Sequence, residues 1–309
     1  MLPAVLPLAL ALAPSGIASR PAPTPIVGGE AVQPGAYPAV ISIRRGAFQC
    51  TGTLLTPTLV LTAAHCFGDG SIAPEALVVT TGNDAGDPDQ VLTVEAYGMH
   101  PDFCNPLDDP QCAQRSDIAD FAWVRLATEV PLDPGAFPVV ITDEALHHEL
   151  VRPGASLLLV GYGEDDDGIT DVKREVTSAI TGFTETGQEL FVGGEGRDSC
   201  FGDSGGPAFA RLDDGTLAIV GVLSRGGECG KGGIYGATLA GLCWVRDDSG
   251  VDVVPTGCGE CSCVDLTPRA ESDEGCGACR SGARGSLGPT LLLASMMLVR
   301  RRRSRFRTR

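Results

Sequence analysis

Basic residues are scarce in this chain outside its last thirty positions. Nine of the 23 Lys and Arg residues lie within residues 280–309, a stretch that contains no Asp or Glu. The remaining 279 residues therefore carry 14 basic and 39 acidic groups. Nucleic-acid binding needs a basic face, so this acidic body predicts no nucleic-acid partner. It favours instead a weak long-range attraction for basic substrates.

Helix-period patterns are also scarce in the sequence. No internal repeat of roughly 20–50 residues is present, which argues against a repeat architecture. Gly (41 residues) and Pro (22 residues) are frequent and separate short apolar runs. Short, evenly spaced runs of this kind predict strands in a closed antiparallel barrel or sandwich. The strand-like runs are residues 39–43, 53–61, 77–80, 91–95, 121–126, 156–160, 172–180, 207–210 and 217–223.

Histidine is rare as well, with four residues in the chain. One of them, His65, follows the strand-like run 53–61 and lies within Thr62-Ala63-Ala64-His65-Cys66. Downstream, Gly202-Asp203-Ser204-Gly205-Gly206-Pro207 places a serine on a tight turn. The glycines let a substrate carbonyl approach the backbone and leave N–H groups free to meet it. A serine needs a base to act as a nucleophile at neutral pH, and His65 is the best candidate.

Four segments occur in one order: Ile26-Val27-Gly28-Gly29, the His65 segment, Asp120-Phe121-Ala122-Trp123-Val124-Arg125-Leu126, and the Ser204 segment. In this order they resemble the trypsin/chymotrypsin family of serine proteases over residues 26–250. The resemblance implies an all-β fold of two six-stranded antiparallel β-barrels, with the active site between them and a short C-terminal helix near residues 239–246. It also implies a serine endopeptidase that needs no cofactor.

The resemblance further implies that Ser204 is the nucleophile, His65 its base and Asp120 the acid that orients the imidazole. Asp117 competes with Asp120 for the last role. Asp120 directly precedes the extended apolar segment, as the family's aspartate does, whereas Asp117 would place a second charge inside the strand. Asp120 is therefore favoured. Ser224 matches a family serine that hydrogen-bonds the catalytic aspartate.

The oxyanion hole is expected to be the N–H groups of Gly202 and Ser204. In the family, the carboxylate that matches Asp203 is buried and pairs with the new α-amino group of the mature N-terminus. That amine would here belong to Ile26, so cleavage before Ile26 is expected to activate a zymogen. Pro25 precedes Ile26, and a tryptic enzyme should not cut there, so a different activating protease is expected.

Asp198 lies six residues before Ser204, where trypsin-like members have the floor of the specificity pocket. A carboxylate there favours substrates with Arg or Lys before the cut. The expected substrate-binding residues are Asp198, Ser224, Gly226 and Gly233, the two glycines matching the pocket walls. The alternative is that Asp198 points to solvent and the pocket takes another residue. Arg225 stands where the family usually has Trp, and it predicts a preference for acidic or polar residues upstream of the cut.

The chain contains twelve cysteines, which read as disulfides in an exported protein. The resemblance implies the disulfides Cys50–Cys66 and Cys200–Cys229. A third pair, Cys104–Cys112, is expected because both cysteines lie in the loop inserted before Asp120. The other six allow 15 connectivities, and zinc binding is the competing interpretation of their close spacing. These six are Cys243, Cys258, Cys261, Cys263, Cys276 and Cys279.

The two ends of the chain predict export and sorting. An apolar start and a small-residue stretch ending at Ala18 are typical of a signal peptide. A Cys/Gly motif, a thirteen-residue apolar run and an Arg cluster resemble the MYXO-CTERM sorting tails of myxobacterial surface proteins. The tail implies transient membrane retention, processing by a sorting protease near residues 276–279, and release or surface attachment; a permanent transmembrane anchor is the alternative. The expected parts are 1–18 signal peptide, 19–25 propeptide, 26–250 protease domain, 251–286 Cys/Gly-rich stalk and 287–309 sorting tail.

The acidic loop 83–89 and the class of the protein each allow a second interpretation. The loop falls where some trypsins bind calcium, although a solvated turn is preferred and no metal is expected.

A non-catalytic binding protein on the same fold is the rival class, but such proteins usually lose a triad residue or the oxyanion glycine, and this chain keeps them. A third possibility is an enzyme limited to one substrate by Arg225 and the loop inserted before Asp120. The sequence thus predicts a secreted or surface-sorted serine endopeptidase.

Overall fold

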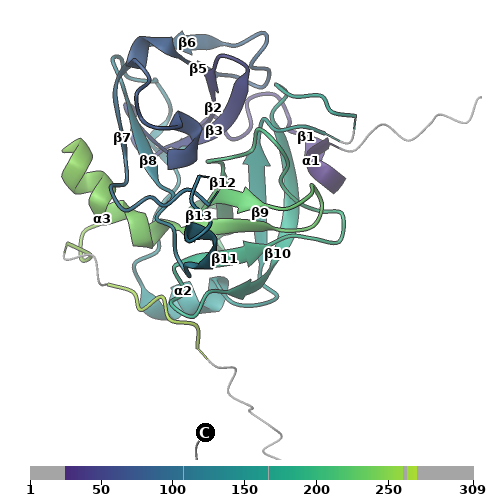
Figure 1. The fold of residues 1–309 in the computed structure, drawn as a ribbon, viewed down its shortest axis with the longest axis vertical. Coiled ribbons are helices and arrows are strands. Elements are labelled where there is room, and N and C mark those ends of the chain that lie inside the picture. The colour runs from purple at the N-terminus through teal and green to yellow at the C-terminus, as the bar shows by residue number, and fades with distance from the viewer. Residues whose placement is uncertain (1–24, 107, 166, 260–262, 270–309) are drawn as a thin grey trace, which may run out of the picture. The chain divides into compact units, whose positions relative to one another are not determined.

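The computed structural model describes residues 25–106, 108–165, 167–259 and 263–269. The expected signal peptide, the propeptide before Pro25 and the sorting tail lie outside these residues. Strands dominate the described part and form two barrel-like sheets (Figure 1). None of the helices in this part is long and apolar enough to cross a membrane.

The N-terminal barrel contains seven strands in the order β6-β5-β2-β3-β4-β8-β7. Only Thr93 separates β6 from β7, so residues 90–99 pair with β5 at their start and with β8 at their end. This stretch closes a ring of six, as the sequence predicts. The strands are β2 (Val40–Arg45), β3 (Phe48–Leu54), β4 (Leu59–Thr62), β5 (Leu77–Thr81), β6 (Gln90–Leu92), β7 (Val94–Met99) and β8 (Ala122–Leu126).

The C-terminal barrel also closes on itself, because β9 pairs with both β10 and β12. The ring runs β10-β11-β14-β13-β12-β9, and the two-residue β1 adds to the outside of β10. The all-β class with two barrels is therefore confirmed. The strands are β1 (Glu30–Ala31), β9 (Ser156–Gly161), β10 (Arg174–Phe183), β11 (Glu189–Val192), β12 (Pro207–Arg211), β13 (Leu217–Gly226) and β14 (Gly233–Ala237).

Two hydrophobic clusters hold the barrels together. Burial alternates residue by residue along most of β10, as expected for a strand with one face on a core and one toward water. The larger cluster fills the N-terminal barrel, continues into the other one through Leu158 and Phe209, and includes Val245 of the C-terminal helix. The second cluster fills the C-terminal barrel around Leu157 and Tyr235. Because the larger cluster spans both barrels, side chains from each are held in fixed positions at their junction.

The strand prediction joined two strands into one and missed two others. Residues 53–61 form parts of two strands, because Thr56 Oγ1 accepts the N–H groups of Thr58 and Leu59 and stabilises a turn between them. Strands β11 and β14 were missed because one is short and the other is rich in glycine, which is usually depleted in strands.

Three α-helices and four short 3-10 helices complete the described part. The expected C-terminal helix is α3, which ends at Gly250 in the left-handed conformation. Helix α2 was not predicted, and it begins where the Asp143 side chain accepts the N–H of Leu146. The helices are α1 (Pro25–Gly28), α2 (Glu144–Leu150), α3 (Thr238–Ser249), η1 (Ala64–Phe67), η2 (Pro74–Ala76), η3 (Cys112–Gln114) and η4 (Pro134–Ala136).

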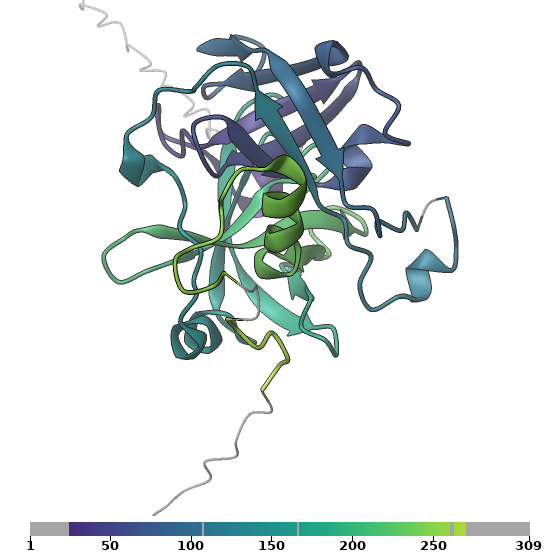
Figure 2. The same cartoon turned by 90° about the vertical axis from the view of Figure 1, so that its left-hand side faces the viewer.

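Two segments lie beside the barrels. The inserted loop that carries η3 projects from the N-terminal barrel in Figure 2. After α3, the chain returns to the C-terminal barrel, where Leu266 packs against the second core cluster. Arg246 also donates to the carbonyl oxygen of Gly259 at 2.8 Å. The described beginning of the expected stalk therefore lies against the barrel domain.

Candidate active site

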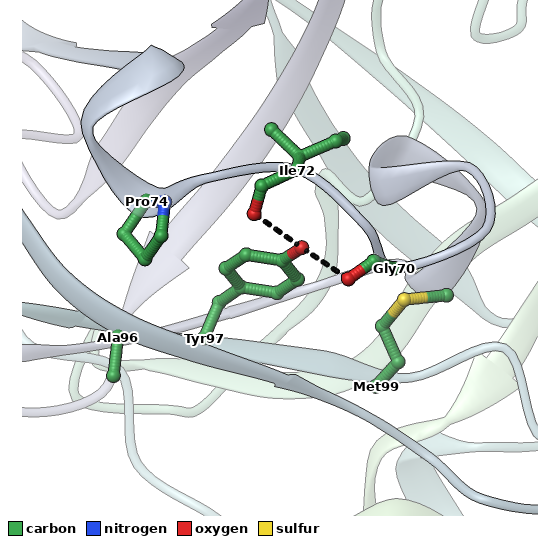
Figure 3. Close-up of a pocket in the computed structure, with 6 residues that line it drawn as sticks. All are labelled: Gly70, Ile72, Pro74, Ala96, Tyr97 and Met99. Carbon is green, nitrogen blue, oxygen red and sulfur yellow. Dashed lines mark hydrogen bonds between the residues drawn. The ribbon is translucent and has the colours of Figure 1, made fainter.

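His65 lies on η1, and a set of contacts behind it anchors the loop that follows. Phe67 stacks on Tyr97 of β7, with ring centroids 4.6 Å apart. The Tyr97 hydroxyl lies 2.8 Å from the carbonyl oxygens of Gly70 and Ile72 (Figure 3). These contacts surround a small pocket that is lined by no charged side chain. They therefore position the loop rather than supply chemistry. The pocket is lined by Gly70, Ile72, Pro74, Ala96, Tyr97 and Met99.

Asp120 holds His65 through two contacts. Asp120 Oδ2 lies 2.8 Å from His65 Nδ1, and Asp120 Oδ1 accepts the His65 N–H at 2.9 Å. Ser224 Oγ donates to Asp120 Oδ2 at 2.7 Å. The aspartate is only 4% exposed, so these bonds replace water around its carboxylate. Asp117 instead accepts the N–H of Ala119, so the structure places Asp120, and not Asp117, beside the imidazole.

Burial and the neighbouring carboxylate act on the pKa of His65 in opposite directions. Burial lowers the pKa because it disfavours the imidazolium, while the charge and hydrogen bond of Asp120 raise it. The net effect raises the pKa of His65 above its ordinary value. A more basic imidazole suits a group that must accept a proton from a hydroxyl.

Ser204 lies on the turn before β12, against the segment that carries His65. Its carbonyl oxygen accepts the N–H of Thr51 at 2.8 Å and lies 3.8 Å from Cys66 Sγ. Gly205 allows the Ser204 turn to approach the segment before His65. Its φ is +78°, and an added Cβ would lie 2.0 Å from Thr62 Oγ1. The two segments therefore meet at the junction of the barrels. Within the described residues, the His65 side chain bonds to Asp120 and not to Ser204.

The N–H groups of Gly202 and Ser204 have no acceptor within the described part of the chain, whereas those of Asp203 and Gly205 are both hydrogen-bonded. Gly202 has a φ of +100°, and an added Cβ would lie 2.9 Å from the Gly163 Cα atom. A side chain at this position would therefore change the backbone. Two unpaired N–H groups on one tight turn can stabilise a negatively charged oxygen.

Asp203 is a buried carboxylate, 3% exposed. It accepts the N–H groups of Gly163 at 2.7 Å and Cys200 at 2.8 Å. Burial nevertheless raises the pKa of Asp203 to about 6. The nearby Arg174 forms its ion pair with Asp165, at 2.6 Å. The Asp203 carboxylate therefore lacks a cation of its own among the described residues, and its desolvation is costly when it is ionised.

Ile26 shares a small cavity with Asp203 and is 1% exposed. The bond to Pro25 is intact in this chain, so the Ile26 nitrogen is an amide and cannot form an ion pair. The backbone at Ile26 has a φ of +41°, which is unfavourable for a β-branched residue. The structure thus places the predicted partners together but leaves the predicted ion pair unformed.

Asp198 is buried, 2% exposed, beside the Ser204 turn. Its oxygens accept the N–H groups of Ser199 at 2.7 Å and Gly232 at 2.5 Å. Burial raises the pKa of Asp198, and these hydrogen bonds oppose that rise. No cation lies within ion-pair distance of Asp198 among the described residues. The carboxylate is therefore buried rather than pointing to solvent, and its charge is available for a ligand.

Gly226 and Gly233 lie directly opposite each other on β13 and β14. A Cβ on Gly233 would lie 3.1 Å from Ser199 Oγ, and one on Gly226 would lie 3.2 Å from the carbonyl oxygen of Gly232. Both glycines thus border the two residues that hydrogen-bond Asp198. Side chains here would occupy the space next to that carboxylate.

Arg225 differs from the expectation drawn from its sequence position. Its guanidinium forms two hydrogen bonds to Glu189, at 2.8 and 2.7 Å, so its charge is already paired. The predicted preference for acidic residues upstream of the cut is therefore not supported by this geometry. Sequence reasoning missed Glu189 because it lies 36 residues from Arg225 and belongs to no recognisable motif.

Thr51 of β3 is a second residue that sequence reasoning missed. Its hydroxyl donates to the carbonyl oxygen of Gly202 at 3.0 Å and accepts the N–H of Tyr162 at 3.1 Å. Its own N–H donates to the Ser204 carbonyl oxygen at 2.8 Å. Thr51 therefore ties the N-terminal barrel to the turn that carries Gly202 and Ser204. No local pattern could reveal it, since Thr51 and Gly202 are 151 residues apart.

The three expected disulfides form, and a fourth lies in the segment after α3. Cys243 is also disulfide-bonded. Three of the six cysteines whose pairing the sequence left open, Cys243, Cys258 and Cys263, are therefore not free to bind zinc as thiolates. Cys261, Cys276 and Cys279 lie outside the described residues. The bonds are Cys50–Cys66, Cys104–Cys112, Cys200–Cys229 and Cys258–Cys263.

Among the described residues, the acidic loop 83–89 contributes no group of three potential metal ligands whose atoms lie close together. Asp84 Oδ1 accepts the N–H of Gly86 at 2.7 Å, as in a simple turn. Within the described residues, the potential metal ligands that lie close together are Cys50, His65 and Cys66. The two cysteines are bound to each other as a disulfide, so their sulfur atoms are not free to bind a metal.

Comparisons with known proteins agree with this geometry. The family model described as Trypsin matches residues 26–240. Coagulation factor XII of Sus scrofa is 30% identical over 252 residues, which cover 72% of this chain and 39% of that protein. Ovochymase-2 of Mus musculus is 28% identical over 228 residues, which cover 67% of this chain and 36% of that protein. The chain spans about 40% of the length of these curated relatives. It belongs to the trypsin family of serine proteases.

Proposed function

We propose that this protein is a serine endopeptidase in which Ser204 attacks the substrate carbonyl and His65 takes the serine proton. Asp120 holds the imidazole and stabilises its cation, with Ser224 fixing the carboxylate. The N–H groups of Gly202 and Ser204 stabilise the oxyanion of the tetrahedral intermediate. His65 then returns the proton to the leaving amine. The observation that carries this proposal is the buried Asp120, which holds His65 against the segment where Ser204 lies.

The specificity that fits the site is cleavage after Arg or Lys. Asp198 offers a buried carboxylate whose hydrogen bonds come from uncharged groups. A substrate guanidinium or ammonium would supply the missing cation and form charge-assisted hydrogen bonds. Gly226 and Gly233 leave room for a long side chain beside it. The substrates are therefore proteins or peptides with Arg or Lys before the cut.

Activation is proposed to occur by cleavage of the Pro25–Ile26 bond. The released amine would give Asp203 the cation that it lacks, and the backbone at Ile26 could leave its unfavourable conformation. A separate protease must make this cut, because proline does not fit a pocket that selects Arg or Lys. N-terminal sequencing of the native mature protein should give Ile26 as the first residue; a different start would exclude this pairing.

Export and surface sorting belong to the same proposal. The apolar start, the disulfides and the resemblance of the tail to sorting signals support a secreted or surface-attached enzyme. A sorting protease that cuts near residues 276–279 is then a second partner. The mass of the mature protein from its native cells would show whether the tail is removed.

The direct test uses the full chain with the recognition sequence of a site-specific protease inserted immediately before Ile26. After cleavage, peptide amides with Arg, Lys, Leu or Ala before the scissile bond are assayed, with Ser204→Ala as control. Turnover after Arg or Lys that is lost in the control supports the mechanism. Asp198→Ser should lose the preference for basic residues while keeping reaction with a fluorophosphonate at Ser204. A folded, cleaved chain that neither hydrolyses any substrate nor reacts with the fluorophosphonate would exclude the proposal.

A further inference from the structure

Arg225 and Glu189 form a bidentate ion pair behind the catalytic aspartate. The Nη1 and Nη2 atoms of Arg225 donate to the two oxygens of Glu189 at 2.8 and 2.7 Å. The Glu189 side chain is 3% exposed, while that of Arg225 is 26% exposed. A carboxylate buried this deeply needs a cation, and the fork geometry fixes the orientation of the guanidinium. Arg225 is therefore held in one position.

The sheet brings this pair to the side on which the catalytic aspartate lies. Strand β14 separates β11 from β13, so Glu189 and Arg225 must meet across it. The residue of β14 opposite Glu189 is Gly236, which has no side chain to block them. A Cβ on Gly236 would lie 2.7 Å from Cζ of Phe121, the residue after Asp120. Residues that face each other in adjacent strands share a face, so the ion pair lies on the face that Phe121 covers.

A β-bulge explains why Ser224 and Arg225 can touch. Neighbouring residues of a regular strand point to opposite faces. In β13 the register shifts between Leu223 and Arg225, which leaves Ser224 as an extra residue. Arg225 Nη1 donates to Ser224 Oγ at 3.4 Å, and Ser224 Oγ donates to Asp120 Oδ2 at 2.7 Å. A continuous series of polar contacts thus runs from Glu189 to the catalytic aspartate.

We propose that Arg225, held by Glu189, is a positioning residue of the active site that orients the Ser224 hydroxyl and places a fixed positive charge behind the catalytic aspartate. This inference rests on the proposed function. The Ser224 hydroxyl has a single hydrogen. If its lone pairs accept from Arg225, that hydrogen is directed to Asp120. The carboxylate then keeps its hydrogen bonds throughout the reaction.

The charge of Arg225 also affects the protonation of His65. A cation near the triad disfavours the imidazolium, so it keeps His65 neutral and active at lower pH. In the part of the chain that the structure describes, Asp120 favours the imidazolium, and Arg45 of β2 lies beside Gly68 in the turn after His65. Glu189 offsets part of the charge of Arg225. Removing Arg225 should therefore move the acid limb of the pH profile in one direction, and removing Glu189 should move it in the other.

The experiment uses the full chain, cleaved before Ile26 as above, and the variants Arg225→Met, Arg225→Lys and Glu189→Gln. The double variant Arg225→Met with Glu189→Gln is included because it leaves no unpaired buried charge. For each, kcat/KM per titrated active site is measured between about pH 5 and 9. Two substrates are used, which carry Asp or Leu two residues before the scissile Arg–X bond. Active sites are counted by fluorophosphonate labelling of Ser204, so unfolded protein does not enter the rates.

Arg225→Met and the double variant should lower kcat/KM by about tenfold, a loss within the range of one misoriented hydrogen bond to a charged group. Arg225→Met should move the acid limb to higher pH, and Glu189→Gln, which keeps one acceptor oxygen, should move it to lower pH. Arg225→Lys should keep the limb near its original position but not restore the full rate, since it lacks the planar fork.

Three outcomes would overturn the inference. The first is an unchanged kcat/KM and acid limb in Arg225→Met and in the double variant, which would make the pair purely structural. The second is a shift in the same direction for Arg225→Met and Glu189→Gln. The third is a change in KM that depends on the Asp or Leu residue of the substrate while the limb stays fixed, which would make Arg225 a substrate-recognition residue. If the unmodified chain shows neither turnover nor labelling, the proposed function fails instead.

Discussion

Gly202 combines two constraints that a side chain would violate. Its φ is +100°, and an added Cβ would lie 2.9 Å from the Gly163 Cα atom. We predict that Gly202→Ala lowers kcat/KM by about 10²–10³-fold, because relief of the clash turns its N–H away from the oxyanion. Steady-state kinetics with titrated active sites measure the effect.

Gly215→Ala is the matched control for this prediction. Gly215 also has a positive φ, +88°, but it lies between β12 and β13 with no atom within 4 Å of an added Cβ. It should lose about 1 kcal/mol of stability from backbone strain and keep its activity. Equal losses of activity in both variants would show that strain alone, and not the position of the Gly202 N–H, is responsible.

Single residues also show where prediction from sequence ends. Ser204, His65 and Asp120 were identified because each belongs to a local segment with a recognisable composition. The structure pairs His65 with Asp120 and brings the Ser204 segment against the His65 segment. Glu189 and Thr51 were missed because they act through partners that only folding brings near. Their neighbours in sequence give no sign of these contacts. In the sequence, a glutamate that is buried on a short strand cannot be distinguished from a glutamate that is exposed to solvent.

Between elements, Phe121 forms the link from α3 to the catalytic aspartate. A Cβ on Gly241 of α3 would lie 2.5 Å from the Phe121 ring. Gly241→Ala should therefore push Phe121 and the adjacent Asp120 out of place, and we predict a loss of about tenfold in kcat/KM together with about 1–3 kcal/mol of stability. Kinetics and urea unfolding of the same preparations measure both losses.

A second substitution tests whether the ring is the cause. Adding Phe121→Leu to Gly241→Ala makes the clashing side chain smaller, so part of the lost activity should return. Gly227→Ala is the control, since an added Cβ there has no atom within 4 Å. Failure of Phe121→Leu to recover any activity would mean that Gly241 acts on the site by another route.

The elements themselves were partly predictable. Alternating and continuous apolar runs predicted most strands of both barrels, because each of these strands is buried in a hydrophobic core on one face or on both faces. The split at Thr56 was missed because the apolar residues on either side of Thr56-Pro57-Thr58 were taken as one strand, although the proline and the two threonines between them are typical of a turn. Helix α2 was missed because seven residues are too few to show a helical period, and its clearest signal is the Asp143 cap.

For the whole molecule, the unpaired Asp203 predicts how pH affects the uncleaved chain. Burial raises the pKa of Asp203 to about 6 in the folded state, above its value in the unfolded chain. The folded state then binds the extra proton, so this contribution to stability is fully present below about pH 4 and is lost as pH rises through about 6. The shift corresponds to about 3 kcal/mol in the free energy of unfolding.

Cleavage before Ile26 should remove this loss, because the new amine pairs with the carboxylate and lowers its pKa. Urea unfolding of cleaved and uncleaved chains, both carrying Ser204→Ala, should show a stability difference that grows in favour of the cleaved chain between about pH 4 and 7. Asp203→Asn should abolish that pH dependence. Parallel curves for the two chains would contradict the pairing of Ile26 with Asp203.

The closure of both sheets has a consequence for self-association. A strand at an open edge offers unpaired N–H and C=O groups to any extended chain that it meets, which is how many β-proteins form aggregates. In the described part of this chain, the rings close through residues 90–99 and through β9, and β1, which lies outside the ring, is only two residues long. A protein of this build can accumulate at high concentration with little sheet edge available for aggregation.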